Sequence, residues 1–340
     1  MRVAKSIKLP WFNIEKLKMS DVTKSVAKKR LFVVLKKMFL YLFIICMSYI
    51  LLYPILFLIS NAIRAREDIF DPSVIWIPKH ITFKNFEYAN MLLSYPTAIK
   101  NTLLILIPSV IIQTFICMMV GYGFARFKFA EREFLFGILL FTIIVPMQTI
   151  IVPLYMKFRY FDFLYLGKLA GLITGRPSTI NLLDTPWPFY ILSFFGMGIR
   201  SSLYIFVFRQ FFRNMPVELE EAAKIDGCGP FSTFLRIMVP NATGAIITIL
   251  LFTIVWHWND YYVSAMFCNE NLPISVMLTA LNNRLSMIQD AYSFSSDDIY
   301  LIQSNVLEAG CLMVILPLII IYVIGQRYFT ESIERTGIVG

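Results

Sequence analysis

Six long runs of apolar residues constrain this chain more than any other feature of its sequence. A helix needs about 20 predominantly apolar residues to cross the hydrocarbon core of a bilayer. Strands of a transmembrane barrel would instead alternate apolar and polar residues over about 10 positions. We therefore predict an all-α, polytopic membrane protein with six transmembrane helices. The six runs cover residues 38–60, 102–121, 134–155, 189–208, 242–259 and 309–325.

Composition and charge agree with a membrane protein. Hydrophobic residues make up 58% of the chain and charged residues only 16%, which does not describe a soluble protein. The net charge of +9 is concentrated in residues 1–37, which hold 11 of the 31 basic side chains and two of the 22 acids. A basic stretch before an apolar run is typical of a cytoplasmic flank that contacts anionic lipids. We therefore expect the lipid bilayer, and no nucleic acid, as the partner of this charge.

The distribution of basic residues predicts the orientation of the spans. Six spans place both termini on one side, and the segments on that side hold 20 basic residues against 10 in the opposite segments. Basic residues accumulate in cytoplasmic loops, so both termini are predicted to be cytoplasmic. The apolar run 38–60 is longer than the 7–15 residues of a signal peptide, which predicts a retained anchor. The predicted organisation is a basic cytoplasmic segment 1–37, a membrane domain 38–330 and a cytoplasmic tail 331–340.

Arg200 is the only Lys, Arg, Asp or Glu within the six runs. Near the centre of a bilayer, an arginine that faces lipid costs about 2.5–3.5 kcal/mol even on the most lenient scale. Two interpretations remain open. Arg200 either forms a buried ion pair or a clamp on backbone carbonyls, or it lies on a translocation pathway and donates hydrogen bonds to a solute.

The cytoplasmic segment 213–240 has the pattern of a helical hairpin. Pro216 suits a first helical turn, and Gly227 is expected in the left-handed conformation that ends a helix. Pro230 is expected to begin a second helix and Pro240 to end it. Spacings of three and four residues predict one apolar face on that second helix, made of Phe231, Phe234, Leu235 and Met238. From these residues alone, such a hairpin either packs under its own bundle or docks on another protein.

The motif Glu221-Ala222-Ala223, followed by Gly227 and then by Ile237 and Pro240, resembles the EAA loop of ABC importer permeases. The chain as a whole is most similar to the MalG-like carbohydrate permeases. Further matching segments are Asn101-Thr102-Leu103, the run 121–129, Val145-Pro146, the run 208–212 and Trp258-Asn259-Asp260. The chain departs from the family in its long outer segment 161–188, in Val239 where leucine is usual, and in a tail without lysine over 336–340.

The resemblance implies the transmembrane domain of a type I (MetI-like) ABC importer in the plasma (inner) membrane of a prokaryote. It implies three kinds of protein partner: ATP-binding cassette subunits, a second homologous permease, and an extracellular solute-binding protein that delivers a sugar or oligosaccharide. The EAA loop would couple to the ATPase, and a translocation pathway would carry the solute. The implied coupling residues are Glu221, Ala222, Ala223, Asp226, Gly227, Phe231, Ile237 and Pro240. The implied pathway residues are Arg200, Trp258, Asn259 and Asp260.

The sequence lacks the motifs that several kinds of binding or catalytic site require. No GxxxxGK[ST] phosphate loop is present, so we expect ATP to be bound by the partner subunit, the chain to be no enzyme, and no cofactor or metal of its own. The two histidines are far apart, and His257 between two tryptophans is interpreted as an interfacial residue. The alternatives are a permease for a non-sugar solute, an autonomous secondary transporter, and an integral membrane enzyme.

Overall fold

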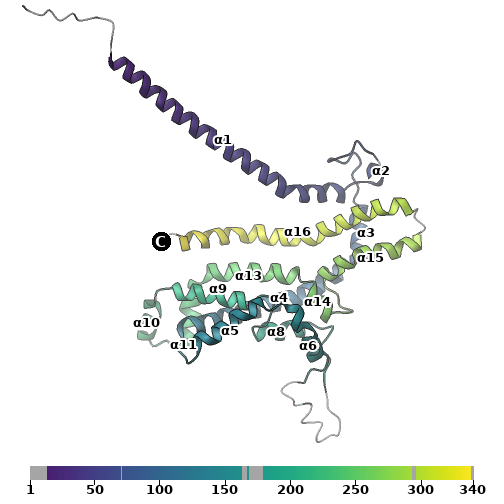
Figure 1. Ribbon diagram of the computed structural model, residues 1–340. Helices are drawn as coiled ribbons and strands as arrows, with labels where there is room; N and C mark the ends of the chain where they lie inside the picture. The colour runs from purple at the N-terminus through teal and green to yellow at the C-terminus, as the bar shows by residue number, and fades with distance from the viewer. Residues whose placement is uncertain (1–13, 70, 163–166, 168–178, 293–295, 338–340) are drawn as a thin grey trace, which may run out of the picture. The chain divides into compact units, whose positions relative to one another are not determined.

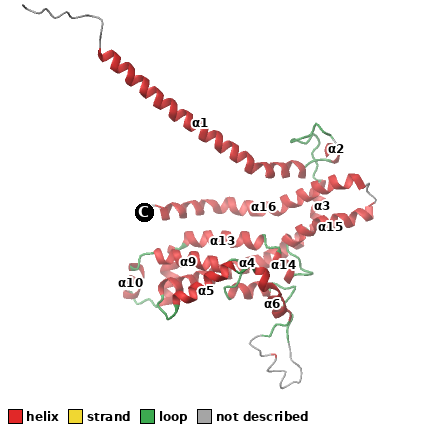
Figure 2. Cartoon of the chain, viewed as in Figure 1, coloured by secondary structure: helices red, strands yellow, loops and turns green. Residues whose placement is uncertain are grey.

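The computed structural model describes residues 14–69, 71–162, 167, 179–292 and 296–337. This part of the chain is built from helices and contains two isolated β-bridges but no β-sheet (Figure 2). The prediction of an all-α protein is therefore confirmed. The helices are α1 (Ile14–Ala62), α2 (Arg66–Ile69), α3 (Lys84–Leu93), α4 (Tyr95–Arg126), α5 (Arg132–Ile144), α6 (Met147–Arg159), α8 (Trp187–Phe194), α9 (Ser201–Asn214), α10 (Glu218–Ile225), α11 (Pro230–Thr233), the π-helix η2 (Phe234–Met238), α12 (Val239–Asn241), α13 (Thr243–Trp258), α14 (Tyr262–Phe267), α15 (Ile274–Tyr292) and α16 (Ser296–Gly337).

The chain divides into two compact units, residues 1–60 and residues 61–340. In the described part of the first unit, α1 is one continuous helix that includes the whole predicted span 38–60. Its apolar side chains from Leu31 to Leu56 are exposed. An exposed helix this apolar suits a lipid environment rather than water.

Among the described residues, three helices are long and apolar enough to cross a bilayer, and up to five spans result if each of two bent helix pairs counts as one. The single helices are α1, α4 and α16, which confirm the first, second and sixth predicted spans. The third predicted span is a pair, α5 and α6, bent by 98°. The bend follows from Pro146, because Val145 before it is extended and Pro146 has no N–H to continue the helix. The fifth span is α13, which turns by 81° from the short helices before it.

The fourth predicted span, 189–208, is not one helix, so the prediction of a single transmembrane helix over these residues is wrong. Helix α8 ends at Phe194 and α9 begins only at Ser201. Gly196 has a left-handed φ of +67° and donates its N–H to the carbonyl of Ser193, while Met197 donates to Leu192 at 2.8 Å. This pair of bonds is a Schellman motif, which ends a helix. The apolar count could not detect the break because it ignores how glycine ends helices.

Helix α4 is the centre of the second unit, where it packs against α8, α9 and α13. Gly121 permits the closest of these contacts, since a Cβ there would lie 2.6 Å from the Cβ of Phe208 on α9. Phe208 belongs to a buried aromatic cluster with Tyr122, Phe212 and Phe234. This cluster joins α4 and α9 to the EAA hairpin, defined here as residues 213–240.

Candidate functional site

The EAA hairpin lies at one end of the second unit, where Figure 1 labels α10 and α11. Its first helix, α10, begins just after Pro216 and carries three glutamates in its first turn, where they complement the helix dipole. The helix ends in a second Schellman motif: Gly227 donates to the carbonyl of Lys224 at 3.0 Å and Cys228 to that of Ala223 at 2.9 Å. Gly227 has a φ of +79°. The predicted left-handed turn is confirmed.

The second half of the hairpin begins at Pro230, as predicted, but does not end at Pro240. A π-turn, η2, follows α11, and Val239 donates its N–H to the carbonyl of Phe234. Pro240 then lies in the first turn of α12. Proline is tolerated at this position because the N–H that it lacks would have no partner within the helix there. The prediction that Pro240 ends the helix is therefore wrong, and the chain turns into α13 after Asn241.

The predicted apolar face of the hairpin is divided between two surroundings. Phe234 is 2% exposed and its ring lies 5.0 Å from that of Tyr122, between centroids, while Met238 is fully buried in the same cluster. Phe231 is 60% exposed, and Leu235 is also exposed. The hairpin therefore packs under its own bundle with one half of the face and leaves the other half available.

The structure brings most of the predicted coupling residues to the surface of this hairpin. Ala223 is the exception, because it is buried, and Ile237 is half-buried. Ile225 is exposed to 87% and was missed by the sequence analysis. A side chain built at Gly227 would meet no atom within 4 Å. The exposed members are Glu221, Ala222, Asp226, Gly227, Phe231 and Pro240.

An ion pair that the sequence analysis missed fastens the hairpin to the bundle. Arg126, the last residue of α4, lies with its Nε 3.1 Å from Oε1 of Glu220 on α10, although the two groups are not aligned for a hydrogen bond. The side chains are only 8% and 10% exposed. Arg126 also donates from Nη2 to the carbonyl of Met215 at 2.6 Å. Removing one partner of a buried pair leaves an uncompensated charge, so α10 is held firmly against the end of α4.

A second buried arginine lies near this end of the bundle. Arg209 on α9 donates from Nη2 to Oε2 of Glu133 at 3.0 Å, and its guanidinium carbon lies 3.8 Å from the ring centroid of Phe136. Arg132 also pairs with Glu133. The charge of Arg209 is thus compensated within the chain.

Arg200 lies in the break between α8 and α9, with a left-handed φ of +61°. Its side chain is exposed, and its guanidinium carbon lies 4.5 Å from the ring centroid of Trp256 on α13. None of the ion pairs in the described part of the chain involves Arg200. The buried pair suggested by the sequence is therefore not formed within these residues.

A buried amide holds this break in place. Gln113 on α4 donates from Nε2 to the carbonyl of Ile199 at 2.7 Å and to Oγ of Ser201 at 2.9 Å. Its Oε1 lies 2.7 Å from Nε2 of His257, which must donate this bond because the amide oxygen can only accept. His257 is buried within the protein. Gln113, which His257 orients, thus contacts the residues on both sides of Arg200.

The other three predicted pathway residues have local contacts within the chain. Trp258 is buried and donates from Nε1 to the carbonyl of Val314 on α16 at 3.1 Å. Asp260 caps α14 by accepting the N–H of Ser264 at 2.8 Å. Asn259 is exposed and donates to the carbonyl of Val255 at 2.9 Å. The structure therefore gives Trp258 and Asp260 packing and capping contacts, and exposes Arg200 and Asn259.

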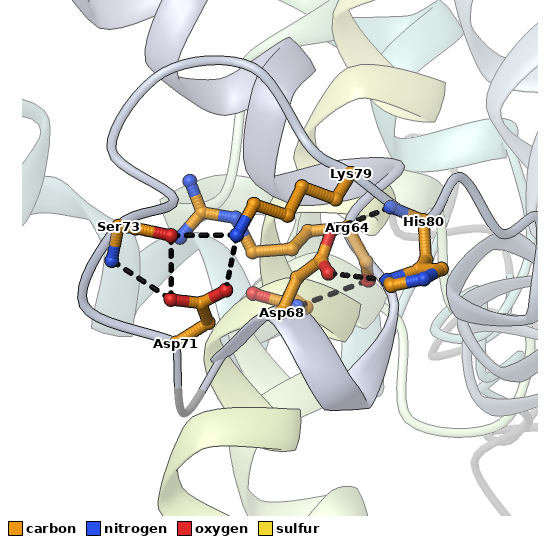
Figure 3. A network of polar contacts seen from close by, with 7 residues as sticks. Arg64, Asp68, Asp71, Ser73, Lys79 and His80 are labelled. Atoms are coloured by element: carbon orange, nitrogen blue, oxygen red, sulfur yellow. Dashed lines mark hydrogen bonds and ion pairs between the residues drawn. The ribbon is translucent and has the colours of Figure 1, made fainter.

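At the start of the second unit, the loop 64–82 holds a polar network (Figure 3). Asp71 accepts hydrogen bonds from Lys79 Nζ at 2.6 Å and from the Ser73 N–H at 2.9 Å. These bonds hold the pKa of Asp71 well below its ordinary value. Asp68 accepts the His80 N–H and also contacts the His80 ring, each at 2.7 Å. Burial raises the pKa of Asp68, but the contacts with His80 outweigh it and the pKa lies below its ordinary value.

The described ends of the long segment 161–188 are fastened to their surroundings. Phe161 and Ile180 exchange two backbone hydrogen bonds, of 3.0 and 2.9 Å. Asp184 accepts the backbone N–H groups of Asn269 and Glu270, and the latter bond measures 2.9 Å. Residues 163–166 and 168–178 of this segment lie outside the described residues.

Comparison with known proteins identifies the family. Residues 113–335 match the family model of the binding-protein-dependent transport system inner membrane components. The chain belongs to this family. The matched range begins at Gln113, so it contains the α8–α9 break and the whole EAA hairpin. The resemblance drawn from the EAA motif is confirmed.

Individual members of the family of inner membrane components are similar over most of their length. The probable starch degradation products transport system permease protein AmyC of Thermoanaerobacterium thermosulfurigenes is 26% identical over 85% of this chain and 92% of its own. The diacetylchitobiose uptake system permease protein NgcG of Streptomyces coelicolor is 23% identical over 86% of this chain and 85% of its own.

The fold is shared with a solved structure. A chain in the crystal structure of a bacterial ABC transporter involved in the import of the acidic polysaccharide alginate superposes with a TM-score of 0.62 at 20% identity. The match covers 89% of this chain and 98% of that chain. At this identity the likeness establishes the fold, which is that of an ABC importer membrane domain.

Proposed function

We propose that this chain is the transmembrane permease subunit of an ATP-driven importer for a sugar or oligosaccharide. Membership of the family of inner membrane components supports the permease role. The transport of starch degradation products and diacetylchitobiose, named for two relatives, supports a carbohydrate as the solute. Both termini are then cytoplasmic, and a solute-binding protein delivers the sugar from outside.

The observation that carries the proposal is the construction of the EAA hairpin. It leaves Glu221, Ala222 and Gly227 exposed, while Glu220 and Phe234 fasten it to α4 and to the buried aromatic cluster. An element that is exposed on one side and rigidly attached on the other is suited to receive a force from a partner. The partner we propose is an ATP-binding cassette subunit, which binds ATP in place of this chain.

The attachment determines where a displacement of the hairpin goes. A shift of α10 acts on Arg126 through the buried ion pair, and therefore on the end of α4. A shift of η2 acts on Tyr122 and Phe212 through Phe234. Since α4 packs against α8, α9 and α13, both routes lead into the helices that would line the pathway with a second, homologous permease.

A pair of glycines two residues apart allows a controlled test. Gly227 has a left-handed φ, whereas Gly229 has a φ of −70°, and a side chain at either position would meet nothing within 4 Å. Gly227→Val should therefore distort the turn, at a cost of about 1–2 kcal/mol, and Gly229→Val should not. We expect Gly227→Val to lose co-purification with the ATPase and uptake of labelled sugar while membrane insertion persists.

Gly229→Val serves as the matched control and should retain both activities. Equal activity of the two variants would contradict coupling through this hairpin. Equal loss in both would show that the surface tolerates no added bulk, in which case the turn geometry is not the determinant.

A further inference from the structure

Two arginines lie within or directly after the fourth apolar run, 189–208, and their charges are compensated differently. Arg209 is buried and pairs with Glu133. Arg200 is exposed, and no ion pair in the described part of the chain includes it. Within an apolar stretch, a charge without a counter-charge is unfavourable against lipid. Arg200 therefore requires a counter-charge that comes from outside the described residues, or water.

The position of Arg200 is fixed rather than adaptable. Gln113 bonds to Ile199 and Ser201, the residues on either side, and is itself completely buried. A Cβ at Gly198 would lie 2.9 Å from the side chain of Gln113, so glycine is needed for the amide to reach the break. Such support from neighbouring residues is the usual way in which a binding group is held ready for a ligand.

Aromatic side chains lie at the break that contains Arg200. Trp256 lies under the guanidinium, and Phe194 and Phe195 at the same break are exposed. Between residues 189 and 208 the sequence contains no Asp or Glu. The guanidinium presents a planar fork of donors that matches a carboxylate with two parallel hydrogen bonds. Exposed aromatic rings offer apolar faces for packing against a ligand.

We propose that Arg200 binds the carboxylate of acidic sugars as they pass, so that this permease favours uronic-acid oligosaccharides over neutral ones. The inference rests on the proposed import function. The other available source of a counter-charge is a carboxylate of the partner permease, and the experiment below separates the two.

The test uses the complete transporter with its ATPase, partner permease and binding protein, reconstituted in proteoliposomes. The probes are two matched pairs, digalacturonate with galactobiose and dimannuronate with mannobiose, whose members differ on each of the two rings by a carboxylate in place of a hydroxymethyl group. The binding protein is the same throughout, so differences between permease variants report on the permease. The variants are Arg200→Gln, Arg200→Lys and the control Lys100→Gln, which removes an exposed charge from α4.

We expect the unaltered transporter to import at least one acidic sugar faster than its neutral counterpart. Arg200→Gln should lower acidic uptake about 10- to 100-fold, the range for a lost charged hydrogen bond, and leave neutral uptake unchanged. Arg200→Lys should recover part of the acidic uptake, because it restores the charge without the fork. Lys100→Gln should behave like the unaltered protein.

Three results would overturn the inference while leaving the import function intact. They are import of neutral sugars only, equal effects of Arg200→Gln on both members of a pair, and no effect of Arg200→Gln at all. Less assembled complex in Arg200→Gln would assign the counter-charge to the partner permease instead. Absence of ATP-dependent import of any sugar, together with no ATPase association, would overturn the proposed function itself.

Discussion

The EAA hairpin and the loop 64–82 are both short segments beside the long helices, and each contains an ion pair, but the pairs differ in burial and in what they join. Arg126 and Glu220 are 8% and 10% exposed and connect α4 to α10. Lys79 and Asp71 are 53% and 34% exposed and belong to the same loop. The ion pair of the hairpin thus fastens it to the bundle, whereas the ion pair between Lys79 and Asp71 joins two residues of the same loop.

This difference indicates different tasks. A buried pair is held by a low-dielectric environment, and breaking it is expensive, so it suits the transfer of a displacement between elements. An exposed pair is screened by water and contributes little to global stability. It stiffens its own loop, which presents side chains such as Ile77 to the surroundings. Substitutions in the EAA hairpin should therefore lower stability more, and affect more distant helices, than substitutions in the loop 64–82.

The largest effect is expected for Glu220→Ala, which leaves Arg126 buried without its counter-charge. The free energy of unfolding should fall by about 3–5 kcal/mol, measured by thermal unfolding of the purified transporter. Replacing both residues, as in Arg126→Met with Glu220→Leu, should recover most of this loss because no charge then remains buried. Glu221→Ala, one position along on the exposed side, is the stability control. A single variant as stable as the unaltered protein would show that the pair does not hold the hairpin.

A loss of similar size is expected for Phe234→Ala, since it removes an aromatic side chain from the buried cluster. Truncation of a buried phenylalanine costs about 3–5 kcal/mol. Phe231→Ala is the matched change on the exposed half of the hairpin and should alter stability by no more than about 0.5 kcal/mol. If Phe231 instead binds the ATPase, its truncation should weaken association without lowering thermal stability. Similar unfolding temperatures for both variants would contradict the division of the apolar face.

A much smaller effect is expected for Lys79→Ala in the loop 64–82. The ion pair with Asp71 is largely exposed, so global thermal stability should hardly change. Hydrogen exchange should increase in this loop alone, and exchange in α4 and α10 should stay as it was. Exchange that spreads beyond the loop would mean that the loop is coupled to the bundle after all.

The smallest effect is expected when the pH is lowered and hydrogen exchange is measured in the same loop, 64–82. Hydrogen bonds from Lys79 and Ser73 hold the pKa of Asp71 below its ordinary value of 3.8. A depressed pKa means that the stabilisation is complete above the ordinary value and is lost as the pH falls through the lower, folded value. Protection of the loop, corrected for intrinsic exchange rates, should therefore be constant from pH 8 to about 5 and decrease only at more acidic pH. A decrease near neutral pH would show that protonation of a group other than Asp71 weakens the network.

Local features of the hairpin could be predicted from sequence, because glycine and proline act through their own backbone geometry. The left-handed Gly227 and the helix start at Pro230 are of this kind. The pairing of Arg126 with Glu220 could not be predicted, since helical spacing says nothing about contacts between distant segments. The same holds for the bond between Gln113 and His257.

The break between α8 and α9 was missed for a different reason. Counting apolar residues treats Gly196 as neutral, although the same residue type was used correctly at Gly227 to end a helix. A search for glycine-ended helices within the apolar runs would have found the interruption. The bonds from Gln113 to Ile199 and Ser201, on either side of Arg200, could still not have been predicted without the structure.

The order in which the chain is made gives the Arg126–Glu220 pair a further consequence. Arg126 leaves the ribosome well before Glu220, and α5 to α9 are synthesised between them. The cation at the end of α4 therefore has no partner until the intervening helices have been inserted and α10 has been translated. The ion pair can therefore form only after the chain from α4 to α10 has been synthesised and inserted. A chain that stalls or is truncated before Glu220 leaves Arg126 without its counter-charge.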